Sequence, residues 1–254
     1  MDMQIIVLGM HRSGTSILSK TLFKLGVEMG NLNNKKVVHN IEGHYEDQKM
    51  LALNEELLLY LKAEWSCLPS ENTINDNKEY IINKYLAYIN SKKGTWGVKE
   101  PRLSIFIHIF HHLLSNPKYI FITRNELSVA KSLEARDNIP IEKGKKLKLQ
   151  YDQRIKSFLL DKNYLSINYE ELQLNPKEEL IKLANFLGLE ARDEAISHIL
   201  PREKIMKKKK KLFRSNFLQA SKMITLNPHY LLRKKSWGAI KKYLRNFINI
   251  YINN

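Results

Sequence analysis

The sequence has little cysteine and no long apolar run. Its 254 residues include one cysteine, Cys67, which excludes an internal disulfide framework and fits a reducing compartment. No segment approaches the roughly 18 uninterrupted apolar residues of a membrane span. The N-terminus lacks the basic start and apolar stretch of a secretory signal. These absences predict a cytoplasmic protein.

Acidic residues are nearly absent from the C-terminal fifth of the chain. Residues 201–254 carry 15 Lys and Arg against one acidic residue, whereas residues 1–200 carry 27 against 25. The net charge of +16 therefore lies almost wholly after residue 200. We accordingly expect a core domain over residues 1–200 and a basic C-terminal extension over 201–254, which includes five consecutive lysines at 207–211.

The end of this extension alternates apolar and basic residues. Apolar side chains recur every three or four residues, which predicts a basic amphipathic helix. Such a helix could pack on the core or on a second subunit, rest on the inner membrane surface, or bind an anionic polysaccharide. The sequence leaves these alternatives and the oligomeric state open. The apolar residues concerned are Trp237, Ile240, Leu244, Phe247 and Tyr251.

Apolar strands alternate with helical segments through the core domain. Strands that are apolar throughout predict a parallel sheet covered on both faces, which is a three-layer α/β/α fold. Ligands of such sheets bind at the carboxyl ends of the strands. We expect strands at 4–9, 95–98, 118–123 and 164–168, and helices at 15–26, 47–63, 77–93, 103–115, 126–137, 142–161 and 176–187.

The loop after the first strand lacks the lysine of a nucleotide triphosphatase. Gly9 and Gly14 have the spacing of G-x-x-x-x-G-K-[ST], but Thr15 occupies the lysine position and the cation is Arg12. Backbone N–H groups of such a loop, at the start of a helix, form an anion site. The loop therefore predicts a site that grips a phosphate without triphosphate chemistry.

This loop, with the sequence H-R-S-G-T-S, resembles the 5′-phosphosulfate loop of sulfotransferases that use 3′-phosphoadenosine 5′-phosphosulfate (PAPS). The chain is identified as a member of this family, of a bacterial, carbohydrate type similar to heparan and tyrosylprotein sulfotransferases. Three further segments match the family in the expected order: residues 97–103 look like its K-[DE]-P segment, 119–124 with Ser132 and Arg136 like its 3′-phosphate segment, and 167–172 with Pro176 and 186–188 like its Y-E-x-L…P…F-L-G stretch.

The resemblance implies two separate anion sites for PAPS. Glycine lets the backbone of the loop approach the ligand, hydroxyls donate hydrogen bonds, and the arginine fork binds oxyanions. The residues implied for the 5′-phosphosulfate are Arg12, Ser13, Gly14, Thr15 and Ser16. Those implied for the 3′-phosphate are Arg124, Ser132 and Arg136, with Tyr169 near the nucleotide.

The resemblance also implies a glutamate base a few tens of residues after the loop. Glu46 matches this position at the start of a predicted helix, and partial desolvation is expected to raise its pKa toward the working pH. His44 and Asp47 are alternative bases. Either Glu46 or Asp47 could instead cap the helix.

Lys99 is the cation expected to stabilise the leaving oxygen. Its family counterpart lies near the transferred group, and Arg12 and His11 are expected to assist, with Arg102 as a further candidate. Side-chain cations suffice for this family without Mg²⁺, and the histidines of the chain lack the acidic or cysteine partners of a metal site. No metal is therefore expected.

The expected reaction moves a sulfuryl group from PAPS to an acceptor hydroxyl and leaves adenosine 3′,5′-bisphosphate (PAP). A glycan or glycan precursor is the expected acceptor, with Trp65 and Trp96 as candidates for stacking on a sugar. Tyrosine, lipid and small-metabolite acceptors remain open. The alternatives are a P-loop kinase-like phosphotransferase and a basic nucleic-acid-binding protein, although the charge of the extension predicts no specific nucleic-acid recognition.

Overall fold

The computed structural model describes residues 2–32 and 43–199. Within them, a parallel four-stranded sheet has the order β2-β1-β3-β4. Ile6 at its centre pairs with Val98 on one side and Tyr119 on the other. The predicted parallel sheet is confirmed, with its second strand one residue later than expected. The strands are β1 (Gln4–Leu8), β2 (Trp96–Lys99), β3 (Pro117–Thr123) and β4 (Tyr164–Asn168).

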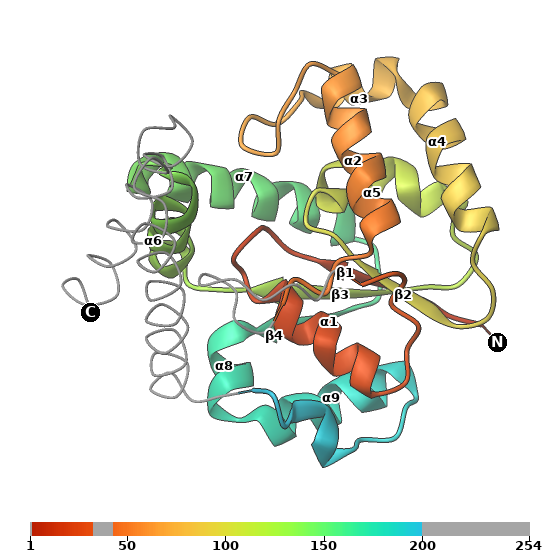
Figure 1. Cartoon of the computed structure of the whole chain (residues 1–254), viewed down its shortest axis with the longest axis vertical. Helices are drawn as coiled ribbons and strands as arrows, with labels where there is room; N and C mark the ends of the chain where they lie inside the picture. Colours follow the sequence, from red (N-terminus) through yellow and green to blue (C-terminus); the bar gives the residue numbers. More distant parts are fainter. Residues whose placement is uncertain (1, 33–42, 200–254) are drawn as a thin grey trace, which may run out of the picture.

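Strand β1 divides its side chains between two apolar cores because successive residues point to opposite faces. Ile6 and Leu8 lie in one core, and Ile5 and Val7 in the other. Helices cover both faces, so the three-layer α/β/α fold is confirmed (Figure 1). The first core is completed by α2 (Gln48–Tyr60), α4 (Lys78–Asn90), α5 (Leu103–Phe110), α6 (Glu126–Asp137) and α7 (Ile141–Leu159), and the second by α1 (Thr15–Lys24), α8 (Tyr169–Leu174) and α9 (Pro176–Leu187).

Two short helices were not expected from the sequence. Helix α3 (Glu71–Asp76) begins at Ser70, whose hydroxyl accepts a hydrogen bond from Thr73 N at 3.0 Å. Helix α8 begins at Asn168 in the same way. Six residues are too few to show a helical period, so caps rather than patterning mark them. The expected helix at 103–115 is α5 followed by the 3-10 turn η1 (His111–Leu113), and a second 3-10 turn, η2 (Asp193–Ile196), follows α9.

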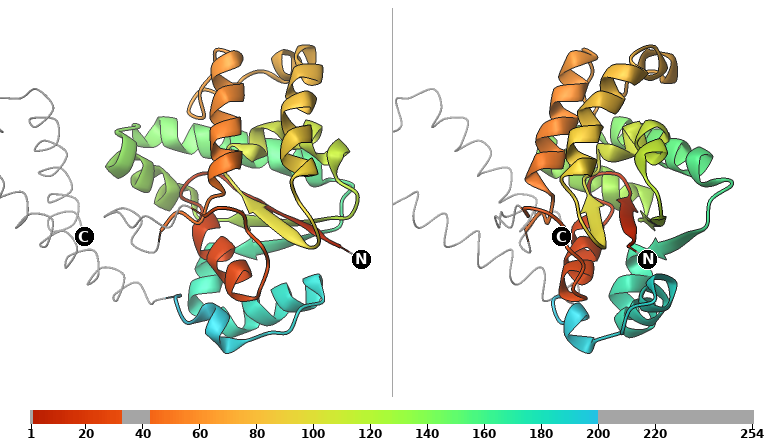
Figure 2. Two further views of the ribbon diagram at one scale, coloured as in Figure 1. Left: turned by 45° about the vertical axis from the view of Figure 1, so that its right-hand side comes forward. Right: turned by 90° about the vertical axis from the view of Figure 1, so that its right-hand side faces the viewer.

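Helices α2 and α4 stand side by side over the sheet, and α1 and α9 lie beneath it (Figure 2). The carboxyl ends of the parallel strands meet at one edge. The loop after β1, the segment after β2 and Arg124 after β3 are consequently brought to the same edge.

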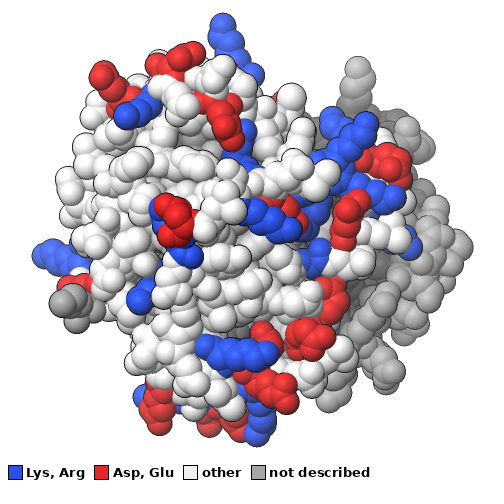
Figure 3. Space-filling view, turned by 180° about the vertical axis from the view of Figure 1, so that it is seen from behind, with Lys and Arg blue, Asp and Glu red and all other residues white. Residues whose placement is uncertain are grey.

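Charge is mixed over the surface of the core. Seen from behind, basic and acidic side chains alternate with uncharged surface (Figure 3), as the near-neutral balance of residues 1–200 indicates. Among residues 2–32 and 43–199, no helix combines the length and apolarity needed to span a membrane. The expected C-terminal extension, with its lysine run and basic helix, lies outside the described residues.

Candidate active site

The loop between β1 and α1 is a tight turn held by groups from distant strands. Gly14 has φ 96°, and a Cβ there would collide with the Cδ2 atom of Tyr169. Arg12 has φ 70°, in the left-handed region that non-glycine residues rarely adopt. Arg124 Nη1 donates to the carbonyl of Arg12 at 2.8 Å. The structure thus brings the predicted loop, Arg124 and Tyr169 together.

The residues of the two predicted anion sites contact each other directly. Arg12 Nε donates to Ser132 Oγ at 2.8 Å, so the loop arginine reaches helix α6. The guanidinium of Arg124 lies over the ring of Tyr169, 4.3 Å from its centroid. Arg136, one turn after Ser132, pairs with Asp137 at 2.6 Å. The predicted residues of both anion sites therefore lie together around the loop.

This cluster is electrostatically strained. Burial, together with the charges of Arg136 and Arg124, lowers the pKa of Arg12 to about 10. Ser13 Oγ and Arg124 Nε are buried, and no hydrogen-bond partner for either occurs among the described residues. Buried polar atoms are ordinarily satisfied. An anionic ligand would relieve both features.

His11, expected to assist at the leaving oxygen, lies in the same loop. Burial, followed by the charge of Arg102, lowers its pKa well below the ordinary value, so the imidazole is neutral. Its ring lies 4.6 Å from that of Trp65, and its Nε2 atom is buried with no partner in the described part of the chain. His11 can therefore give or accept one hydrogen bond but supplies no positive charge.

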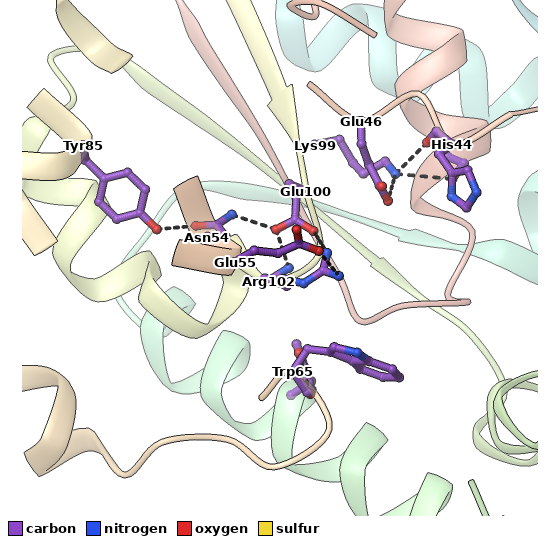
Figure 4. A network of polar contacts seen from close by, with 11 residues as sticks. His44, Glu46, Asn54, Glu55, Trp65, Tyr85, Lys99, Glu100 and Arg102 are labelled. Carbon is purple, nitrogen blue, oxygen red and sulfur yellow. Dashed lines mark hydrogen bonds and ion pairs between the residues drawn. The ribbon is translucent and has the colours of Figure 1, made fainter. Parts of the chain in front are cut away.

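Lys99 joins three segments at the end of β2. Its fully buried ammonium donates to Glu46 Oε1 at 2.8 Å, to the carbonyl of His44 at 2.7 Å and to Ser16 Oγ at 3.3 Å (Figure 4). Ser16 belongs to the first turn of α1. The predicted catalytic lysine, the predicted base and the anion loop are thus within direct contact.

The charge state of Glu46 corrects one expectation. The residue is 8% exposed, and burial alone would raise its pKa, but the charge and hydrogen bond of Lys99, together with the charges of His44 and Arg102, outweigh burial and lower it. Glu46 is therefore an ionised carboxylate.

The neighbouring acid, Asp47, is the helix cap. Asp47 Oδ1 accepts from Lys49 N at 3.0 Å, and its Oδ2 accepts from Tyr88 and Lys92. Both carboxylate oxygens of Asp47 are therefore occupied by hydrogen bonds, whereas Glu46 bonds to Lys99.

Comparisons with known proteins now identify the family. A family model described as "Sulfotransferase family" matches residues 4–194, and one described as "Sulfotransferase domain" matches residues 149–252. The chain belongs to the sulfotransferase family. The second match runs across residue 200 into the basic segment. A search of curated proteins found no match for this sulfotransferase sequence.

Solved sulfotransferase structures are among the matches of this chain. The sulfotransferase domain of the curacin biosynthetic pathway is 17% identical, with a TM-score of 0.51, and 77% of each chain is covered. The sulfotransferase domain of the Synechococcus PCC 7002 olefin synthase is 21% identical, with a TM-score of 0.49, and 77% of this chain and 76% of that chain are covered. At these identities the likeness to the curacin domain concerns the fold alone.

Sequence reasoning assigned no role to Glu100, the most deeply buried acid of the site. It accepts hydrogen bonds from Asn54 and Arg102 and is fully buried. A signal was present, since Asn54 occupies the core-facing position between Met50 and Leu57 on α2, where an apolar residue is expected. Among residues 2–32 and 43–199, no group of three or more His, Cys, Asp or Glu could hold a metal ion.

Proposed function

We propose that this sulfotransferase uses PAPS and transfers its sulfuryl group to an acceptor hydroxyl. The observation that supports it best is the half-buried cluster of Arg12, Arg124 and Arg136 around the start of α1. Burial, together with the charges of Arg136 and Arg124, lowers the pKa of Arg12 to about 10, and a ligand with several negative charges would be favoured there. A nucleotide with a 5′-phosphosulfate and a 3′-phosphate has this character.

The residues present fit such a ligand. The unpartnered Ser13 hydroxyl, the backbone at Gly14 and the first turn of α1 would hold the 5′-phosphosulfate, with Thr15 and Ser16 supplying hydroxyls. Arg124, Ser132 and Arg136 would hold the 3′-phosphate, and Arg12 lies between the two groups. Tyr169, packed on Gly14 and Arg124, would lie beside the nucleotide.

Glu46 and Lys99 are suited to two tasks of sulfuryl transfer, which are to remove the proton of the acceptor and to stabilise the leaving oxygen. Glu46 would accept the proton of the acceptor hydroxyl as the new O–S bond forms. Lys99 would donate to the bridging oxygen, which keeps the electron pair of the breaking S–O bond. Sulfuryl transfer resembles phosphoryl transfer in its loose, in-line transition state, where positioning and electrostatics dominate. An ionised Glu46 is in the state that this role requires.

Nucleotide preference tests this proposal. Without added metal, PAP should raise the melting temperature, and calorimetry should show much weaker binding of adenosine 5′-phosphate. Losing the bonds to the 3′-phosphate should cost about 2–5 kcal/mol, because each charge-assisted hydrogen bond is worth about 1.5–3. Equal affinity for both nucleotides, or stabilisation by ATP with Mg²⁺ instead of PAP, would contradict the proposal.

We further propose a carbohydrate hydroxyl as the acceptor. Trp65 is half-buried beside His11 and Arg136, so it is available to contact an acceptor, whereas Trp96 is buried in the core. A screen of glycan, tyrosine-peptide and lipid acceptors with radiolabelled PAPS tests the acceptor class. Label transferred only to non-carbohydrate acceptors would overturn this assignment.

A further inference from the structure

Glu100 occupies an unusual position for a carboxylate. It follows Lys99 at the end of β2 and is completely buried. Its Oε2 atom accepts from Asn54 Nδ2 at 2.7 Å and from the backbone N of Arg102 at 2.9 Å, and its Oε1 accepts from Arg102 Nη1 at 2.5 Å. Burying a charged pair is costly, so a purely structural pair would gain little over apolar packing.

Side chains from helices α2 and α4, which lie over the sheet, fix the Glu100 carboxylate. Asn54, on α2, donates to Glu100 through Nδ2 and accepts from Tyr85 Oη, on α4, at 2.5 Å through Oδ1 (Figure 4). Both side chains are completely buried. Because each polar atom of Asn54 has one partner, the amide has one orientation, and Glu100 is held in turn.

Glu100 and Glu55 together hold the guanidinium of Arg102. Arg102 Nη1 bonds to Glu100, and Nη2 donates to Glu55 Oε1 at 3.2 Å. The Arg102 side chain is only 13% exposed. Arg102 lies three residues after Lys99 and is drawn beside Glu100 in the same close view as Glu46 and Lys99 (Figure 4), and its charge contributes to lowering the pKa of both His11 and Glu46.

We propose that Glu100 is a positioning residue for the transfer reaction, acting by holding Arg102 beside the Glu46–Lys99 pair as a second cation at the sulfuryl end. The inference rests on the proposed sulfuryl transfer. Arg102 would face negative charge on the sulfuryl oxygens while Lys99 faces the bridging oxygen. Glu100 touches neither group and acts only through Arg102.

A simpler role for Glu100 is to cap α5, because it accepts from Arg102 N at the start of that helix. Glu100→Gln separates the two roles. The amide oxygen can still accept from Asn54 and from the backbone of Arg102, whereas the amide nitrogen cannot pair with the guanidinium. A cap would thus largely survive, and the hold on Arg102 would be lost.

The experiment is a double-mutant cycle of Glu100→Gln and Arg102→Met, with Glu55→Gln as a control on the exposed partner of Arg102. Release of sulfate from radiolabelled PAPS with water as acceptor gives kcat and KM, calorimetry gives PAP affinity, and thermal melting reports the fold. We expect Glu100→Gln and Arg102→Met each to lower kcat about 10- to 100-fold with PAP affinity nearly unchanged, and Glu55→Gln to lower kcat less, because Glu55 is 58% exposed. Because Glu100 acts through Arg102, the double variant should be no slower than Arg102→Met alone.

Two results would overturn the inference. Multiplying losses in the double variant would show that Glu100 acts independently of Arg102. A Glu100→Gln protein with normal kcat and a lowered melting temperature would show that Glu100 is only a cap. By contrast, a wild-type protein that neither binds PAP nor releases sulfate would refute the proposed function itself, and the inference with it.

Discussion

The two ends of the site handle positive charge in opposite ways. At the end proposed for the nucleotide, Arg12 bonds to a hydroxyl, and Arg124 bonds to a carbonyl and stacks on a ring. At the end proposed for the sulfuryl group, Lys99 is paired with Glu46 and Arg102 with Glu100. At the first end Arg136 pairs with Asp137, and the charges of Arg136 and Arg124 act on Arg12, whereas at the second Lys99 and Arg102 each bond directly to a buried carboxylate.

This difference follows from what each end must do. A binding surface gains affinity when the ligand brings negative charge to a cluster of cations. A reacting centre gains rate only from interactions that strengthen in the transition state, so its cations are held in place before the ligand arrives. Carboxylates hold Lys99 and Arg102 at fixed positions, and one of these carboxylates is also the proposed base.

The largest effect is expected from Glu46→Gln, which removes the proposed base from the end of the site where Lys99 and Arg102 bond to carboxylates. Turnover should fall about 10²–10⁴-fold, the usual contribution of a positioned base, while PAP binding stays near normal. Single-turnover kinetics and calorimetry measure the two quantities.

Asp47→Asn is the matched control for Glu46→Gln, because Asp47 caps α2 and contacts Tyr88 and Lys92. This variant should lose stability with little change in turnover. If Glu46→Gln instead lost as much nucleotide affinity as Arg124→Ala, Glu46 would belong to the binding end and the distinction would fail.

The second prediction concerns the cost of burying the Glu100 carboxylate, which appears as a change of protein stability with pH. Burial raises the pKa of Glu100 to about 7, although Arg102 opposes the shift. Between the unfolded pKa of about 4.3 and this value, the native state binds a proton that the unfolded chain has released, so the unfolding free energy falls as pH rises. Relative to Glu100→Gln, the wild type should lose about 3 kcal/mol between pH 4.5 and 8.

Denaturant titrations across this pH range test the prediction, and Glu190→Gln, an acid exposed on the surface, is the control. The Glu190→Gln curve should run parallel to that of the wild type. A parallel curve for Glu100→Gln would show that the Glu100 carboxyl does not titrate in this window.

Arg124→Ala removes an arginine from the end of the site proposed for the nucleotide, and its effect should be smaller than that of Glu46→Gln. PAP affinity should fall by about 1.5–3 kcal/mol, because one charge-assisted contact is lost, and kcat at saturation should change less. Arg192→Ala, which removes an exposed arginine paired with Glu190, should leave PAP affinity unchanged in calorimetry. Loss of kcat without loss of affinity would place Arg124 at the reacting centre instead.

The sequence made the arrangement of the site predictable but not its charge states. Buried strands imply that the loop, Lys99 and Arg124 meet at one edge, because the carboxyl ends of parallel strands share it. The lowered pKa of Glu46 depends on Lys99 lying 2.8 Å away, a contact between residues 53 apart in the chain. Position in the sequence indicated that Glu46 would be desolvated, but not which charge would face it.

The polar network behind Lys99 could not be predicted for a similar reason. Glu100 was visible in the K-[DE]-P segment, but its partners Asn54 and Tyr85 come from two separate helices. Helical periodicity places Asn54 on the core face of α2 and says nothing of what it meets there. Packing between α2 and α4 decides this.

The smallest effect, a loss of stability, is expected at Gly14 in the anion loop. Gly14→Ala should destabilise the protein, because its φ of 96° suits glycine and a Cβ would collide with the Tyr169 ring. Gly26→Ala is the matched control, since Gly26 has φ 90° and a Cβ added there would meet nothing within 4 Å, so it isolates the backbone cost. Denaturant titration should show about 1–2 kcal/mol of extra loss at Gly14.

Tyr169→Ala in the Gly14→Ala background should recover that excess if the collision causes it. Recovery of stability without PAP affinity would confirm that Tyr169 also serves the nucleotide, whereas equal losses at Gly14 and Gly26 would show that the ring moves aside freely.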